Sequence, residues 1–159
     1  DFLSRAHLID DADVAIVFGG TNDYFWSDRP IHGYGEQYFE FAVRKLAKQV
    51  KEKRLEKTTL FVTPYPHNGI GNFSGGSYWK ESNRHDTSEK NYNGHTLKPY
   101  VAIIATICEE NDIPCLNLFH DFGFSWQEHT SDGCHPNEAG HILIAKAITE
   151  KLRALKLSF

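Results

Sequence analysis

The order of apolar runs and amphipathic stretches constrains the fold of this chain more than any other feature of its sequence. Residues 13–18 and 59–63 are compact apolar runs that stop at glycine or proline, as expected of strands covered on both faces. Residues 115–119 form a third, weaker candidate. Apolar residues recur three and four positions apart over residues 39–50 and 97–108, as on one face of a helix. This alternation predicts parallel strands joined by helical crossovers, in a three-layer α/β/α domain.

The two ends of the chain extend this pattern. Helical spacing recurs over residues 144–155, and the segment 136–138, Pro-Asn-Glu, precedes it as a helix start. Residues 2–9 look like the tail of an amphipathic helix. Because three strands make a small sheet, we expect a preceding strand and helix to complete it. We therefore interpret residues 1–159 as a single domain, of which this chain is the C-terminal majority.

Composition excludes several classes of protein. With 159 residues, 40% hydrophobic and 24% charged, the chain has the composition of a globular domain and not of a disordered or fibrous one. Its apolar runs are far shorter than the about 18 to 20 residues that a membrane span needs. The net charge of −4 argues against a nucleic-acid partner. Three cysteines leave the cellular compartment undecided, and because methionine is absent we expect translation to begin upstream of Asp1.

The longest interruption of the pattern runs from Pro64 to about His95. It is rich in glycine and aromatic residues and has no clear period. Loops of this length are usually functional, so a lid or substrate wall is one interpretation and a solvated insertion is the other. Tyr65 in this loop and Tyr24, which follows the first apolar run, are candidates to line a substrate pocket. Core packing beneath the following loop is an equal alternative for Tyr24.

Asp132 and His135 form the first candidate catalytic element. Ligands of parallel sheets bind beyond the carboxyl ends of the strands, and this segment follows the third candidate strand. Across a turn that contains Gly133 and closes at Pro136, the carboxylate can accept a hydrogen bond from imidazole Nδ1. The other ring nitrogen then serves as a general base near neutral pH. The same residues also suit a plain capping turn in which His135 faces solvent.

Gly19, Gly20 and Asn22 form the second candidate element. The two glycines let the backbone turn sharply where the first strand ends, and Asn22 can direct a neutral amide donor toward a developing oxyanion. An ordinary turn, formed for conformational reasons alone, is the alternative. Because both elements follow strands of a parallel sheet, we expect them at the same edge of that sheet.

Together the two segments resemble the motifs of one family. Residues 20–23, Gly-Thr-Asn-Asp, are similar to the Gly-x-Asn-Asp block of the SGNH (GDSL-type) hydrolases. Residues 132–136, Asp-Gly-Cys-His-Pro, resemble the Asp-x-x-His-Pro block of the same family. The resemblance implies a flavodoxin-like α/β/α fold and hydrolysis of carboxylic esters through an acyl-enzyme, with neither metal nor cofactor.

The resemblance also implies a role for each matched residue. Asn22 would donate to the oxyanion, on a turn that Gly20 shapes. His135 would act as general base and then as general acid, and Asp132 would orient its imidazole. We expect the substrate to be a small-molecule or carbohydrate ester, with a short acyl group on a polar carrier.

The chain departs from the family pattern at the nucleophile. The family's Gly-Asp-Ser block is absent, and so is the block whose glycine N–H completes the oxyanion hole. None of the serines follows Gly-Asp, and Ser77, which follows two glycines, does not follow a candidate strand. We therefore expect the nucleophilic serine upstream of this chain.

Two alternatives to a serine esterase stay open. A binding fragment or a degenerate relative without catalysis would account for the missing serine. A metal-dependent hydrolase would draw its ligands from a polar cluster whose spacing matches neither a Cys-x-x-Cys nor a His-x-x-x-His motif. That cluster consists of His120, Asp121, His129, Asp132, Cys134 and His135. The sequence does not indicate an oligomeric state.

Overall fold

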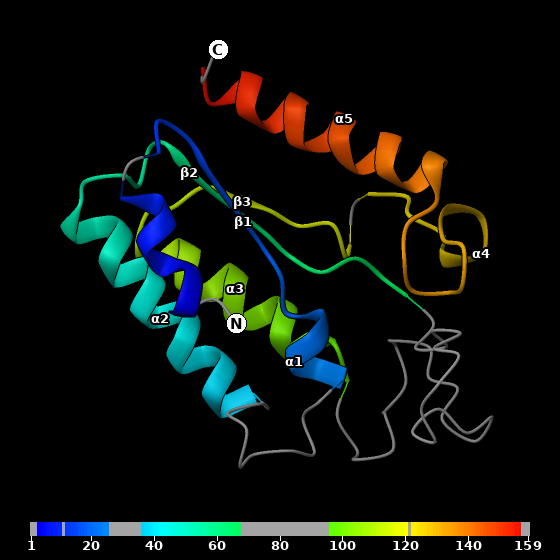
Figure 1. The fold of residues 1–159 in the computed structure, drawn as a ribbon, viewed down its shortest axis with the longest axis horizontal. Helices are drawn as coiled ribbons and strands as arrows, with labels where there is room; N and C mark the ends of the chain where they lie inside the picture. Colours follow the sequence, from blue (N-terminus) through cyan, green and yellow to red (C-terminus); the bar gives the residue numbers. More distant parts are fainter. Residues whose placement is uncertain (1–2, 11, 26–35, 68–95, 121, 157–159) are drawn as a thin grey trace.

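Three parallel strands form the centre of the molecule. The structure is a computed structural model, which describes residues 3–10, 12–25, 36–67, 96–120 and 122–156. Strand β1 (Ala15–Phe18) pairs with β2 (Thr59–Val62), and β2 pairs with β3 (Cys115–Leu116), in the order β1-β2-β3. Ala15 lies opposite Thr59, and Phe61 lies opposite Cys115. All three carboxyl ends therefore lie at the same edge of the sheet (Figure 1).

Helices cover both faces of this sheet. A 3-10 helix, η1 (Leu3–Ile9), lies on one face together with α2 (Glu36–Glu52) and α3 (Lys98–Glu110), and α5 (Glu138–Ala154) lies on the other (Figure 1). Successive side chains of β2 alternate between the two resulting cores, because strand side chains point to opposite faces in turn. Phe61 packs with the α2–α3 core, whereas Leu60 and Val62 pack with the α5 core. The three-layer α/β fold is thus confirmed.

The helices form where the spacing of apolar residues predicts them. On α2, the residues that the pattern selects are at most 2% exposed; they are Phe39, Val43, Leu46 and Val50. The selected residues of α3 are buried in the same core; they are Leu97 at its N-cap, Val101, Ile104 and Cys108. Helix α5 begins at Glu138, and its N-cap is Asn137, whose side chain accepts a hydrogen bond from the N–H of Gly140.

The third strand is shorter than the apolar run that predicts it. Its pairing with β2 ends at Leu116, because the next residues bond with side chains in place of the sheet. Asn117 Oδ1 accepts hydrogen bonds from the N–H groups of Phe119 and His120, and Leu118 N–H donates to the hydroxyl of Thr63. A polar residue inside an apolar run thus turns the chain out of the sheet.

Among the residues that the structure describes, the first strand pairs on one side only. Ala15 N–H donates to the carbonyl of Thr58, so the alternating N–H groups of Ile16 and Phe18 point away from β2. Ile16 and Phe18 are 47% and 39% exposed. Because strand side chains alternate, they lie on the face opposite to Val17, which packs in the α2–α3 core. Within the described residues, the expectation that this strand is covered on both faces is therefore wrong for β1.

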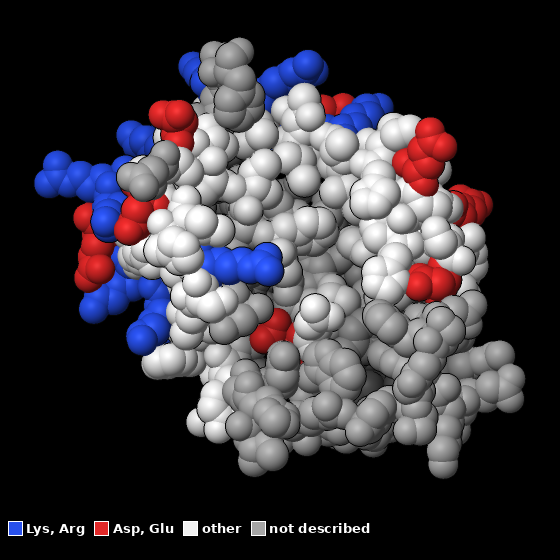
Figure 2. Space-filling view, viewed as in Figure 1, with Lys and Arg blue, Asp and Glu red and all other residues white. Residues whose placement is uncertain are grey.

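Basic side chains are unevenly distributed on the face shown in Figure 2. Lys and Arg side chains gather over the part of the molecule where α2 lies, and the centre of the same face is largely uncharged (Figure 2). Several of these basic side chains pair with carboxylates, for example Arg44 with Glu40 and Glu110. No helix in the described ranges is both long enough and apolar enough to span a membrane. The three cysteines are free thiols.

Candidate active site

The turn from Asp132 to His135 brings a carboxylate and an imidazole into direct contact. His135 Nδ1 lies 2.6 Å from Asp132 Oδ2. The other carboxylate oxygen accepts hydrogen bonds from the N–H groups of Cys134 and His135, at 2.9 and 2.7 Å. Gly133 permits the turn because its φ is +88°, a value that side chains with a Cβ rarely adopt. The carboxylate therefore caps the turn and holds the imidazole at the same time.

The charge of Asp132 determines which ring nitrogen of His135 carries the proton. Partial burial alone would raise the pKa of Asp132, but the hydrogen bonds from the backbone and side chain of His135 and from Cys134 outweigh it and lower that pKa. An ionised carboxylate can only accept hydrogen bonds, so the bond between the two side chains requires a proton on His135 Nδ1, which acts as the donor. Nε2 is then the basic nitrogen of an imidazole that is 57% exposed to solvent.

Cys134 lies between these two residues without being a nucleophile. Its side chain is buried, and burial, followed by the negative charge of Asp132, raises the pKa of its thiol to about 12. A thiol of that pKa carries almost no thiolate near neutral pH, and the thiolate is the reactive form of cysteine. Cys134 contributes to the site through its backbone carbonyl, which accepts a hydrogen bond of 2.9 Å from the hydroxyl of Tyr65.

Tyr65 and Tyr24 are both buried in the part of the chain that the structure describes. Tyr65 is 9% exposed, and its hydroxyl bonds to the protein backbone. Tyr24 is completely buried in the α2–α3 core, edge-on to the rings of Tyr100 and His67. These contacts serve packing and positioning, and the substrate-lining role expected of the two residues stays a prediction.

Asn137 holds the base of the turn and was not among the site residues selected from the sequence. Its side-chain amide donates to the carbonyl of Glu128, 2.8 Å away, at the end of α4 (Trp126–His129). Its side-chain oxygen caps α5, and an isolated bridge joins Thr130 to Pro136. An asparagine directly before a predicted helix is the signal that identifies this cap. The turn that carries Asp132 and His135 is thus closed between two helices.

Asn22 lies on the turn that follows β1. It is exposed in the first turn of the short helix α1 (Thr21–Phe25). Gly20, directly before this helix, has a φ of +110°, and a Cβ there would lie 3.0 Å from Pro64 Cγ and 3.1 Å from Phe39 Cζ. Glycine is therefore required at this position both for its backbone conformation and for the close approach of neighbouring side chains.

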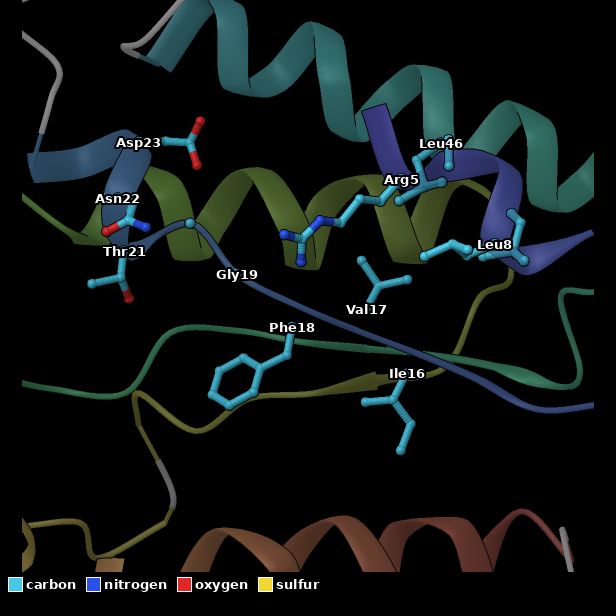
Figure 3. A pocket seen from close by; sticks show the side chains of 13 residues that line it. Arg5, Leu8, Ile16, Val17, Phe18, Gly19, Thr21, Asn22, Asp23 and Leu46 are labelled. Atoms are coloured by element: carbon cyan, nitrogen blue, oxygen red, sulfur yellow. The ribbon is translucent and has the colours of Figure 1, made fainter. Parts of the chain in front are cut away.

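A groove of about 490 Å³ runs along the open edge of β1 to this turn. Its wall is made by β1, by the Gly19–Asn22 turn and by η1, and Figure 3 shows the side chain of Arg5 extending from η1 over the backbone near Gly19. Asp23 also lines the groove, and burial raises the pKa of its carboxyl. The candidate oxyanion donor Asn22 thus stands at the end of a hollow that adjoins an unpaired strand edge.

One aromatic contact and one hydrogen bond, both made by Tyr65, connect the two candidate elements. The ring of Phe18, at the end of β1, lies 6.2 Å from the ring of Tyr65, edge to face. The hydroxyl of Tyr65 reaches the turn between Asp132 and His135. Both elements therefore lie at the carboxyl edge of the sheet, as the sequence predicts for a parallel arrangement.

The polar cluster between residues 120 and 135 is described except for Asp121. Among the described residues, no group of three or more His, Cys, Asp or Glu side chains is arranged to hold a metal ion. Asp121 lies outside the described residues, as does most of the loop from Pro64 to His95. His129 Nδ1 lies within hydrogen-bond distance of the Ser125 backbone, and the Asp132 carboxylate is hydrogen-bonded to His135.

The comparison with protein families assigns the chain to a class. Residues 2–143 match the GDSL-like Lipase/Acylhydrolase family, and the chain belongs to that family. This is the family to which the SGNH (GDSL-type) motifs point. Its members and their structural relatives are esterases and acylhydrolases, so the family supports ester hydrolysis in general. No curated protein matches the chain.

Solved structures share the fold over nearly the whole chain. A protein from Lactobacillus plantarum is 28% identical with a TM-score of 0.70, and the match covers 96% of this chain and 72% of that one. A lipase/acylhydrolase from Enterococcus faecalis is 18% identical with a TM-score of 0.66, covering 96% and 68%. A catalytic mutant of an acetylxylan esterase from Geobacillus stearothermophilus is 18% identical with a TM-score of 0.65, covering 96% and 66%.

Proposed function

We propose that this chain carries the general base and one oxyanion donor of a serine esterase that cleaves carboxylic esters. The observation that carries the proposal is the contact of 2.6 Å between His135 Nδ1 and an Asp132 carboxylate that two backbone N–H groups hold in place. This arrangement fixes the tautomer in which Nε2 accepts a proton. Asn22, at the same sheet edge, supplies an amide donor for the oxyanion.

The proposed reaction proceeds in two halves. A serine Oγ attacks the ester carbonyl as its proton passes to His135 Nε2, and the carbonyl electrons move onto the oxygen that Asn22 stabilises. The intermediate collapses when the C–O bond to the alcohol breaks, and the alcohol leaves with the proton from His135. Water then attacks the acyl-serine as its proton passes to His135, the bond between the acyl carbon and Oγ breaks, and the serine leaves with the proton from His135 as the acid is released. Throughout, Asp132 stays ionised and stabilises the imidazolium.

The nucleophilic serine comes, in this proposal, from a segment that precedes Asp1 in the complete gene product. The Gly-Asp-Ser block is absent from these 159 residues. The open edge of β1 supports the proposal, because a further parallel strand paired there would end beside Asn22. The match also covers only 72% and 66% of two of the related chains. One of these is a catalytic mutant in which a serine is replaced by alanine.

The proposed substrate is a short acyl ester on a polar, carbohydrate carrier. The structural likeness to an acetylxylan esterase supports this choice, and so does the polar and aromatic character of the loop between residues 64 and 95.

Hydrolysis by the complete gene product tests the proposal. We expect turnover of p-nitrophenyl acetate and release of acetate from acetylated oligosaccharides, with rates that fall as the acyl chain lengthens. Activity should survive EDTA. If no ester in this series is hydrolysed while an acetylated oligosaccharide still binds, a non-catalytic binding role replaces the esterase. If EDTA abolishes the hydrolysis, the metal-dependent alternative replaces it.

A further inference from the structure

We propose that Tyr65 is a positioning residue for the general base, which acts by fixing the peptide unit that carries His135. The proposal rests on the proposed esterase function and goes beyond it, because Tyr65 belongs to neither of the family-like motifs. It also differs from the substrate-lining role that the sequence suggests for this tyrosine.

The peptide bond between Cys134 and His135 is held at both of its polar ends. At one end, the Tyr65 hydroxyl donates to the Cys134 carbonyl at 2.9 Å. At the other, the His135 N–H donates to Asp132 Oδ1 at 2.7 Å. A change of ψ at Cys134 would break both bonds, because it turns the Cys134 carbonyl and the His135 N–H together. It would also move the Cα of His135 and so change the direction of the imidazole toward Asp132 Oδ2.

The two hydrogen bonds anchor the turn to different parts of the molecule. The bond to Asp132 is local, since donor and acceptor lie three residues apart. The bond from Tyr65 spans 69 residues and ties the turn to the segment that follows β2. Without it, the turn keeps its internal hydrogen bonds but loses this connection to the sheet edge, where Asn22 also lies. Tyr65 therefore sets the position of the base relative to the oxyanion donor.

Tyr65 is itself held rigidly, which a positioning residue requires. Its ring lies 4.5 Å from the ring of Phe124 at an angle of 34°, and edge-on to Phe18 at 6.2 Å. It is 9% exposed. Burial, followed by the charges of Cys134 and Asp132, raises the pKa of its hydroxyl, so the group remains protonated and donates at every working pH.

The variant Tyr65→Phe in the complete gene product tests this proposal, because it removes the hydroxyl and keeps the ring that packs on Phe124. Loss of one hydrogen bond to a buried carbonyl should lower kcat by about threefold to tenfold. KM should stay within about twofold, because the substrate does not contact this hydroxyl. The thermal unfolding temperature establishes that the variant is folded at the assay temperature.

A spectroscopic measurement detects positioning independently of catalysis. In protein labelled with ¹⁵N-histidine, His135 of the wild type should show the tautomer protonated at Nδ1, with its resonance assigned by its loss in His135→Ala. In Tyr65→Phe the Nε2-protonated tautomer should appear beside it. Tyr38→Phe, which removes an identical hydroxyl from the exposed surface of α2, should leave kcat and the tautomer unchanged.

The two readouts separate failure of this proposal from failure of the esterase function. Tyr65→Phe with wild-type kcat and an unchanged tautomer would overturn the positioning role. A rise in KM with an unchanged kcat would overturn it too, in favour of substrate contact. If the wild type hydrolyses no ester, the esterase function is wrong, and the tautomer of His135 in Tyr65→Phe still decides whether the hydroxyl positions the imidazole.

Discussion

The two carboxylate oxygens of Asp132 have different partners and different roles. One oxygen bonds to two backbone N–H groups, as in a capping turn, and the other bonds to the imidazole, as in a catalytic pair. The sequence leaves open a capping turn and a carboxylate that orients the imidazole, and the structure contains the hydrogen bonds of both. A capping role does not argue against catalysis here, since the cap is what holds the carboxylate in position.

Asn22→Ala tests the oxyanion role in the complete gene product. Removal of one oxyanion donor should lower kcat by about 10²- to 10³-fold with little change in KM, because the bond forms only as negative charge develops. Steady-state kinetics on p-nitrophenyl acetate measure both constants. Asn111→Ala is the matched control, since that amide bonds to Ile107 at the end of α3. A kcat equal to that of the wild type would remove Asn22 from the mechanism.

His135→Ala separates a chemical role from a structural one. The side chain is 57% exposed, so its loss removes little packing and should change the unfolding temperature by only about 1–2 °C. Ester turnover should nevertheless fall to near the background rate, because no other described group takes up the serine proton in this mechanism. His141→Ala, on the exposed surface of α5, should keep full activity. An unfolded His135→Ala protein would instead indicate that the residue is structural.

At the scale of elements, the turn after β1 depends on a glycine. Gly20→Ala should destabilise the protein by about 2–3 kcal/mol, because the new Cβ meets Pro64 and Phe39 in addition to the strained φ. Gly123→Ala should cost only about 1 kcal/mol, since its φ is +65° but nothing lies within 4 Å of its Cβ. Urea unfolding compares the two. Equal losses of free energy would show that crowding at Gly20 does not matter.

The elements differ in how far the sequence predicts them. Helices α2, α3 and α5 follow from local periodicity, because their apolar faces meet a core on every turn. Strand β2 follows from a compact apolar run, because all four of its residues are buried. The early end of β3 does not, since it depends on Asn117 bonding to backbone groups that lie beyond it. Within the site, the Asp132–His135 pair is predictable because three residues separate its members. The contact from Tyr65 to Cys134 is not, because only the tertiary fold brings residues 69 positions apart together.

At the scale of the whole molecule, Asp132 also links stability to pH. Its pKa in the folded protein lies below the ordinary value of 3.8, so its contribution to the free energy of unfolding is complete above about pH 5. The contribution is lost as the pH falls below 3.8 through the folded-state pKa. Asp132→Asn, which cannot titrate, should therefore show a smaller loss of unfolding free energy than the wild type between pH 5 and about pH 2. If the unfolding free energies of the two proteins fall equally with pH over this range, the linkage to Asp132 is wrong.

Covalent labelling of the complete gene product with a serine-directed fluorophosphonate, followed by peptide mass spectrometry, tests the proposed serine esterase. We expect one phosphonylated residue, a serine in the segment proposed to precede Asp1, and labelling that disappears in His135→Ala. The wild-type protein should lose ester hydrolysis in proportion to the label. An adduct on a serine within residues 1–159, labelling that persists in His135→Ala, or hydrolysis of esters by an enzyme that is not labelled would show that the proposed mechanism is wrong.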